Sequence, residues 1–245
     1  MEQETTQSTP KKSISLGASI VTAAVIIALA LIIVMGPKSA KTTGSDTMVP
    51  AQPQQVTSVP ADVVKIRAND RIRGDITKAE IAVIEYSDSD CPFCERFHST
   101  MQQAFTEYNG KVAWVYRYFP LASLHPNATT EAIALECVAE IGGNTAFNNF
   151  LDQIINVTLS PDPKSNEKLT AFATAEGVNA AAFKSCIAGS AASNRVKADT
   201  EEAQKIGAQG TPFSIIVNLK TGKQVIVPGA YPIEDIRADI DSLLK

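Results

Sequence analysis

The feature that most constrains the fold is a predicted strand that is followed by a pair of cysteines at the start of a predicted helix. Residues 81–86 are apolar and rich in β-branched side chains, which predicts a strand. Pro92 then stands where a helix should begin, and that helix should run to about Tyr108. Residues 112–118 predict a second strand. Strand, helix and strand at this spacing indicate a βαβ unit with parallel strands and a right-handed crossover.

The rest of the chain predicts a helical block and then a return to strands. From about residue 123 to 209 the pattern is rich in Ala and helical. Residues 213–217 and 224–227 predict a hairpin, and an amphipathic helix should begin near Pro232. The first and last parts therefore form one α/β sheet, interrupted by a helical insert, within a domain at residues 62–245.

An uncharged run near the N-terminus is incompatible with a place in this domain. Between Lys12 and Lys38 stand 25 residues without charge. As a helix they would span roughly 37 Å, enough for a hydrocarbon core of about 30 Å. We expect a short tail at 1–12 and a transmembrane anchor at 13–36. A cleaved signal peptide is the alternative, although its apolar region is typically only about 7–15 residues long.

Residues 37–61 predict a flexible linker. They are punctuated by prolines, rich in Thr, Ser, Gln and Lys, and poor in large apolar side chains. As a coil this segment would reach on the order of 28 Å, so it would hold the domain away from the membrane.

The overall composition excludes two classes of protein. With 44% hydrophobic and 20% charged residues, the chain is not wholly disordered. Its net charge is −4 and it has no long basic run, so nucleic-acid binding has no electrostatic basis here.

Cys91 and Cys94 lie where the predicted strand gives way to the helix. A Cys-X-X-Cys at this place in a βαβ unit is typical of thioredoxin-type redox sites. The N–H groups and dipole of a helix start favour a Cys91 thiolate, and the spacing lets Cys94 close a disulfide with it. Asp88 and Asp90 oppose that thiolate, and the balance between these effects is open.

The other two cysteines, Cys137 and Cys186, stand alone on apolar helical patterns, 49 positions apart. A zinc site normally needs two further ligands at a recognisable spacing, so no metal site is expected. The two residues either form a second disulfide that braces the helical insert or remain buried thiols, and the disulfide is slightly favoured.

Several stretches resemble the DsbA-like family within the thioredoxin superfamily. Residues 83–94, Val-Ile-Glu-Tyr-Ser-Asp-Ser-Asp-Cys-Pro-Phe-Cys, resemble its active-site strand and helix. Further resemblance lies in residues 116–121, 134–138 and 203–213. The similarity extends over about residues 62–245, and it implies a thioredoxin-like fold with a helical insertion, here preceded by a transmembrane helix and a linker.

The resemblance also implies roles for residues outside the cysteine pair. Thr211-Pro212 matches the family's cis-proline loop, which faces the cysteines and binds the extended substrate chain. Glu85 matches a buried acid that exchanges a proton with the buried thiol, here Cys94. Without the resemblance, Glu85 could equally lie on a strand edge and face water.

The dipeptide between the cysteines departs from the family pattern. Well-known oxidases of the family carry His there, whereas this chain has Pro92-Phe93. Because Phe cannot donate a hydrogen bond to a thiolate, the strength of the oxidising character is left open.

These observations predict a thiol–disulfide oxidoreductase that forms disulfides in proteins outside the cytoplasm, on the periplasmic or extracellular side of the membrane. It needs no cofactor. Its expected partners are cysteine-containing protein substrates, a redox partner that resets the pair, and the membrane through the N-terminal helix. A disulfide isomerase or reductase is the alternative. The alternative of another class is a non-catalytic module that binds partner chains or a soft metal such as copper.

Overall fold

The computed structural model of the chain describes residues 58–155 and 165–245. The predicted tail and anchor, and most of the predicted linker, lie outside these residues. Within the described ranges, none of the helices combines the length and the apolar character that crossing a membrane requires.

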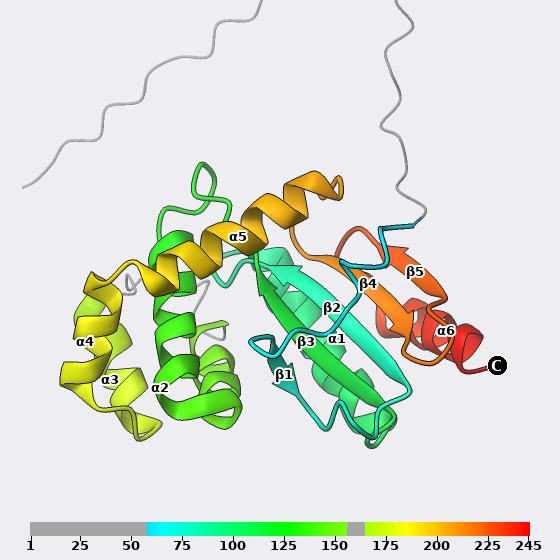
Figure 1. The fold of residues 1–245 in the computed structure, drawn as a ribbon, viewed down its shortest axis with the longest axis horizontal. Helices are drawn as coiled ribbons and strands as arrows, with labels where there is room; N and C mark the ends of the chain where they lie inside the picture. Colours follow the sequence, from blue (N-terminus) through cyan, green and yellow to red (C-terminus); the bar gives the residue numbers. More distant parts are fainter. Residues whose placement is uncertain (1–57, 156–164) are drawn as a thin grey trace, which may run out of the picture. The chain divides into compact units, whose positions relative to one another are not determined.

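The described residues form five strands and six helices (Figure 1). The strands are β1 (Arg71–Arg73), β2 (Ile81–Ser87), β3 (Val112–Tyr118), β4 (Phe213–Asn218) and β5 (Gln224–Val227). The helices are α1 (Pro92–Glu107), α2 (Ala128–Ile155), α3 (Asn166–Ala175), α4 (Ala180–Ala188), α5 (Ala191–Lys205) and α6 (Ile233–Leu244).

The five strands form one sheet in the order β1-β3-β2-β4-β5. β2 pairs in parallel with β3 and antiparallel with β4, so it lies at the centre, and all of its residues are buried. The parallel pair with α1 between its strands confirms the predicted βαβ unit. β1 was not predicted, because an edge strand of three residues reading Arg-Ile-Arg has too little apolar pattern to be recognised.

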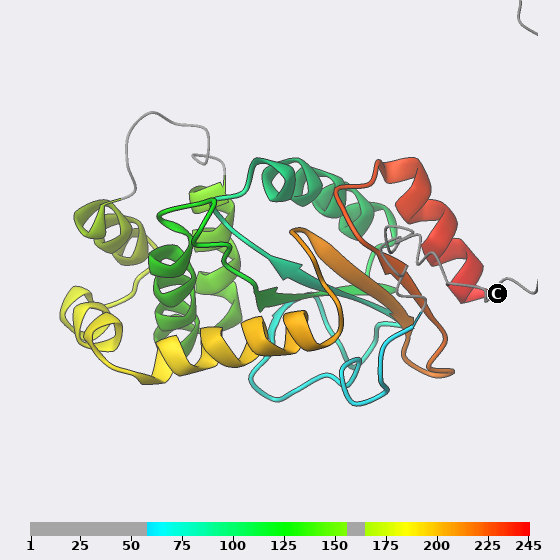
Figure 2. The ribbon, with the colours of Figure 1, turned by 90° about the horizontal axis from the view of Figure 1, so that it is seen from above.

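Helices cover both faces of the sheet. Figure 2 shows α1 and α6 on one side, and α5 with the segment before β1 on the other. α6 contributes Ile236, Ile240 and Leu243 at helical spacing to the first layer. Ala203 and Ile206, at the end of α5, contribute to the second layer.

The helical insert, α2 to α5, enters the chain between β3 and β4 and packs against the end of β3. Tyr116 and Tyr118 of β3 belong to the same apolar cluster as Phe147 and Phe150 of α2. α2 is interrupted at Gly143, whose φ of +75° is a backbone conformation that only Gly adopts readily.

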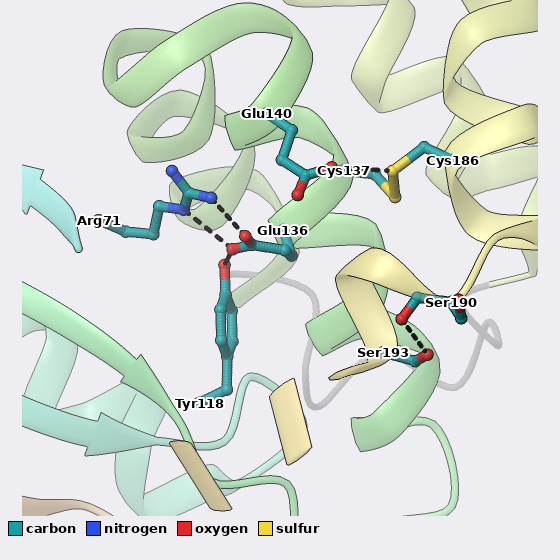
Figure 3. The surroundings of a disulfide bond; sticks show 8 residues. All are labelled: Arg71, Tyr118, Glu136, Cys137, Glu140, Cys186, Ser190 and Ser193. Carbon is teal, nitrogen blue, oxygen red and sulfur yellow. Dashed lines mark hydrogen bonds and ion pairs between the residues drawn. A yellow bond between two sulfur atoms is a disulfide. The ribbon is translucent and has the colours of Figure 1, made fainter. Parts of the chain in front are cut away.

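A disulfide between Cys137 of α2 and Cys186 of α4 joins two helices of the insert, as expected (Figure 3). Next to it, Glu136 connects the insert to the sheet. Its carboxylate accepts hydrogen bonds from Arg71 Nε at 2.9 Å and from the Tyr118 hydroxyl at 2.8 Å (Figure 3). The insert is therefore tied to β1 and β3 by buried polar contacts as well as by apolar packing.

The predicted linker boundary at residue 61 is too late. Val59 is buried, its N–H donates to the Gln224 side chain at 3.0 Å, and its carbonyl accepts from that side chain at 2.9 Å. The sequence did not indicate this, because Val59 is a single apolar residue next to Pro60 in a polar stretch. It nevertheless packs on the sheet.

Arg117 of β3, which is fully buried, holds this N-terminal segment against the sheet. Its guanidinium contacts both carboxylate oxygens of Asp70, at 3.1 and 3.0 Å. It also donates to the carbonyls of Val63 and Lys65 and to the Tyr86 hydroxyl. A buried cation is tolerated here because its N–H groups are satisfied and a buried carboxylate faces it.

We expect Arg117→Met to lower the free energy of unfolding by about 3–5 kcal/mol, because it leaves Asp70 buried without this cation. Urea denaturation measures the change. The control is Arg237→Met, since Arg237 and Glu107 form a solvent-exposed ion pair whose loss should change stability little. Equal losses in the two variants would contradict the importance of the buried contact.

Candidate active site

Cys91 occupies the N-cap position of α1, and Pro92 provides the first helical residue. Cys91 has an extended backbone, with φ −95° and ψ 123°, and its N–H donates to the Asp88 carbonyl at 3.2 Å. A short turn from the end of β2 therefore places the sulfur where the N–H groups of a helix start lack intrahelical partners.

Cys94 lies one turn further along α1 and is completely buried. Both thiols are free, and Ile155 at the end of α2 packs against them. The Cys94 thiol and the N–H groups of Cys94 and Phe93 form hydrogen bonds that favour the Cys91 thiolate, and they lower the pKa of Cys91 to about 5 although burial opposes this. Burial and the adjacent charge of Cys91 raise the pKa of Cys94 well above its usual value.

Thr211 and Pro212 lie next to the cysteines, although about 120 positions separate them in the sequence. The bond between them is cis, as the resemblance implied. The Thr211 carbonyl accepts a hydrogen bond from the Cys91 thiol at 3.7 Å. Pro212 directly precedes β4, and Phe213 of β4 pairs with Tyr86 of β2, so the sheet register brings this loop to the end of β2.

Glu85 lies in β2 between Tyr116 of β3 and Ser214 of β4, and only 1% of its surface is exposed. The water-facing alternative is therefore wrong. Burial raises the pKa of this carboxyl to about 7, although the hydrogen bond from Trp114 favours the ionised form. A carboxyl with this pKa can both give and accept a proton near neutral pH.

Trp114 was not recognised as part of the site from the sequence. Its indole N–H donates to Glu85 Oε2 at 2.8 Å. The His98 ring lies 4.9 Å from the Trp114 ring, centroid to centroid, and the Arg73 guanidinium lies 5.4 Å from it. The available signal was a Trp in a buried strand, since a buried indole N–H normally has a polar partner.

The sequence also gave no sign that Asp88 and His125 would meet. His125 Nδ1 lies 2.7 Å from Asp88 Oδ2, although 37 positions separate the two residues.

Phe93, between the two cysteines, is 55% exposed, and the Arg96 guanidinium lies 4.6 Å from the centre of its ring. The dipeptide thus presents an aromatic surface to solvent next to the cysteine pair.

The sequence model of a family described as thioredoxin matches residues 67–240. The chain belongs to the thioredoxin family. Among solved structures, Wolbachia pipientis alpha-DsbA1 is 24% identical, with a TM-score of 0.63 over 75% of this chain and 94% of that one. Pseudomonas aeruginosa DsbA2 is 23% identical, with a TM-score of 0.60 over 73% and 96%. These likenesses show that the described residues have the thioredoxin-like fold of DsbA proteins.

Curated relatives of this thioredoxin-family chain include much longer proteins. The Na(+)/H(+) antiporter NhaA 1 of Mycobacterium sp. strain KMS is 28% identical over 182 residues, which is 73% of this chain. The match spans 28% of the antiporter's length. The similarity therefore concerns one part of that relative.

We expect Glu85→Gln to make the reduced protein more stable, by up to about 3 kcal/mol above pH 7. Folding raises the pKa of Glu85 from 4.5 to about 7. Its contribution to stability is thus complete below about pH 4.5 and is lost as the pH rises through about 7. Gln has no charge to bury. Urea unfolding at about pH 5 and about pH 8 tests this, and a gain that is equal at both pH values would contradict it.

We expect the Cys91 thiolate of the reduced protein to titrate with a midpoint near pH 5, visible in thiolate absorbance and in the rate of alkylation by iodoacetamide. Cys94→Ala should move this midpoint upward, because it removes the thiol that donates to the thiolate. Cys91→Ser provides the baseline, since it removes the titrating group. A midpoint that stays at the same pH in Cys94→Ala would contradict the role of that hydrogen bond.

Proposed function

We propose that the chain is a thiol–disulfide oxidoreductase that acts on protein cysteines through Cys91 and Cys94. The contrast between the two thiols carries the proposal. Cys91 has a pKa of about 5 at a helix start, whereas Cys94 is buried with a raised pKa. In disulfide exchange, a thiol that is ionised near neutral pH serves both as the attacking nucleophile and as a good leaving group.

In the proposed oxidising direction, a substrate thiolate attacks Sγ of Cys91 in the Cys91–Cys94 disulfide. The bond between the two cysteines breaks, and Cys94 leaves as a thiolate that takes a proton from Glu85. A second substrate thiolate then attacks the substrate sulfur of the mixed disulfide, and Cys91 leaves as a thiolate. The substrate loses two electrons and the cysteine pair gains them, so a redox partner must reoxidise the pair.

Two features support disulfide formation over isomerisation or reduction. The low pKa of Cys91 makes it a good leaving group and stabilises the reduced pair, which is the product of substrate oxidation. Glu85, with a pKa of about 7, is poised to give the proton that Cys94 needs. We assign substrate binding to the Thr211-Pro212 loop because its Thr211 carbonyl lies against the Cys91 sulfur.

We also propose that residues 13–36 anchor the domain to a membrane after a tail at 1–12, and that the domain lies outside the cytoplasm. The Cys137–Cys186 disulfide supports this location, because structural disulfides persist mainly in oxidising compartments. Protease added to intact cells or spheroplasts should digest the domain, whereas protection until lysis would contradict the location.

We expect Cys91→Ser to abolish disulfide exchange in a refolding assay with a reduced, cysteine-containing substrate. The matched variant, Cys94→Ser, keeps the nucleophile and loses the resolving thiol. It should therefore accumulate a mixed disulfide with the oxidised substrate, visible on a non-reducing gel. Exchange that persists in Cys91→Ser, or the absence of a trapped species in Cys94→Ser, would overturn the proposed function.

A further inference from the structure

Asp88 places a buried carboxylate next to the reactive sulfur. Its side chain is completely buried, and its own backbone carbonyl accepts the N–H of Cys91 at 3.2 Å. A negative charge so close to Cys91 should disfavour a thiolate there. A group that neutralises this carboxylate would therefore favour the thiolate, in addition to the hydrogen bonds that Cys91 accepts from Cys94 and Phe93.

Three donors surround the Asp88 carboxylate. Oδ1 accepts from the Asp90 N–H at 2.8 Å. Oδ2 accepts from the Leu121 N–H at 2.8 Å and from His125 Nδ1 at 2.7 Å. Two of these donors are neutral amides, whereas the imidazole of His125 can carry a full positive charge.

The loop after β3 holds His125 in this place. Its backbone N–H donates to the Leu121 carbonyl at 2.9 Å, and its carbonyl accepts from the Ala128 N–H at 3.2 Å, at the start of α2. Its side chain remains 17% exposed, so water reaches the imidazole without unfolding of the loop. The geometry thus fixes the imidazole on Asp88 while leaving it free to titrate.

The charged groups that act on His125 come from the turn between β2 and α1. They are Asp88, Cys91 and Asp90. Burial lowers the pKa of His125, but the hydrogen bond and charge of Asp88, together with the charges of Cys91 and Asp90, outweigh it and raise that pKa above its usual value. His125 is therefore more basic than an ordinary imidazole while Cys91 is a thiolate.

We propose that His125 is a positioning residue for the exchange reaction: its imidazolium pairs with Asp88 and thereby prevents this carboxylate from destabilising the Cys91 thiolate. This inference rests on the proposed function and deepens it. The loop after β3 thus places a basic side chain beside the site, whereas the Pro92-Phe93 dipeptide between the cysteines has none. His125 acts through Asp88, so it need not touch Cys91 or the substrate.

The oxidising strength of the cysteine pair should therefore depend on the protonation of His125. The thiolate and the imidazolium stabilise each other reciprocally. The reduced pair is therefore favoured most while His125 is protonated, and the pair becomes a weaker oxidant as His125 loses its proton.

The test is the pKa of the Cys91 thiol, followed by thiolate absorbance in the reduced full-length protein. His125→Gln should raise it by about one unit or more, because Asp88 then lacks its cation. Asp88→Asn should not raise it, because this change removes the carboxylate that opposes the thiolate and leaves His125 in place. In the Asp88→Asn background, His125→Gln should raise the Cys91 pKa by less than it does in the otherwise unchanged protein, because the carboxylate that His125 offsets is gone.

Two results would overturn the proposal. One is an unchanged Cys91 pKa in His125→Gln. The other is the same increase with and without the Asp88 carboxylate, which would mean that His125 does not act through Asp88. Thiolate absorbance does not depend on exchange activity, so loss of the proposed function would appear separately, as an inactive protein whose Cys91 still shifts.

A second measurement keeps the proposal testable even if His125→Gln fails to fold. The chain has two histidines, so NMR can follow the titration of each imidazole in the native protein. The pKa of His125 should lie above 6.5 in the reduced protein and should fall in Cys91→Ser, which removes the thiolate. A His125 pKa that is the same in both proteins would contradict the coupling.

Discussion

The pairing of β2 with β3 on one side and β4 on the other assembles the site. β2 ends at the turn that leads into Cys91. Residues of β3 and β4, and of the loops next to them, that lie beside this end of β2 are therefore close to the cysteines. β3 contributes Trp114 and the loop that holds His125, and β4 is preceded by Thr211-Pro212. One central strand therefore gathers residues that are far apart along the chain.

Burial and hydrogen bonding divide the chemistry among three acidic groups that lie close together. The start of α1 favours the charged form of Cys91, whereas the interior favours the neutral form of Cys94. Glu85 is buried too, but the hydrogen bond from the Trp114 indole limits the rise of its pKa to about 7. Cys91 is thereby suited to act as nucleophile and leaving group, and Cys94 and Glu85 are suited to exchange a proton with each other.

Much of this arrangement was accessible from the sequence because it depends on local patterns. The βαβ unit, the hairpin and the position of Pro92 follow from periodicity and helix-start preferences. The four predicted strands, β2 to β5, differ from the observed ones by at most one residue at an end, whereas the short β1 was missed. Contacts that depend on packing between distant segments were missed. The Asp88–His125 pair joins two loops, the Trp114 N–H of β3 donates to an acid on the adjacent strand β2, and Val59 packs on the domain from a polar stretch. None of these contacts leaves a periodic signal.

The contact between Trp114 and Glu85 gives the protein a built-in optical reporter. Trp114 is the one tryptophan of the chain, and its indole nitrogen lies 2.8 Å from the carboxyl whose charge changes near neutral pH. Indole emission responds to a nearby charge, and here no second tryptophan obscures the signal. The ionisation of the buried acid can thus be followed by fluorescence in the unlabelled protein, while the cysteines remain free to react.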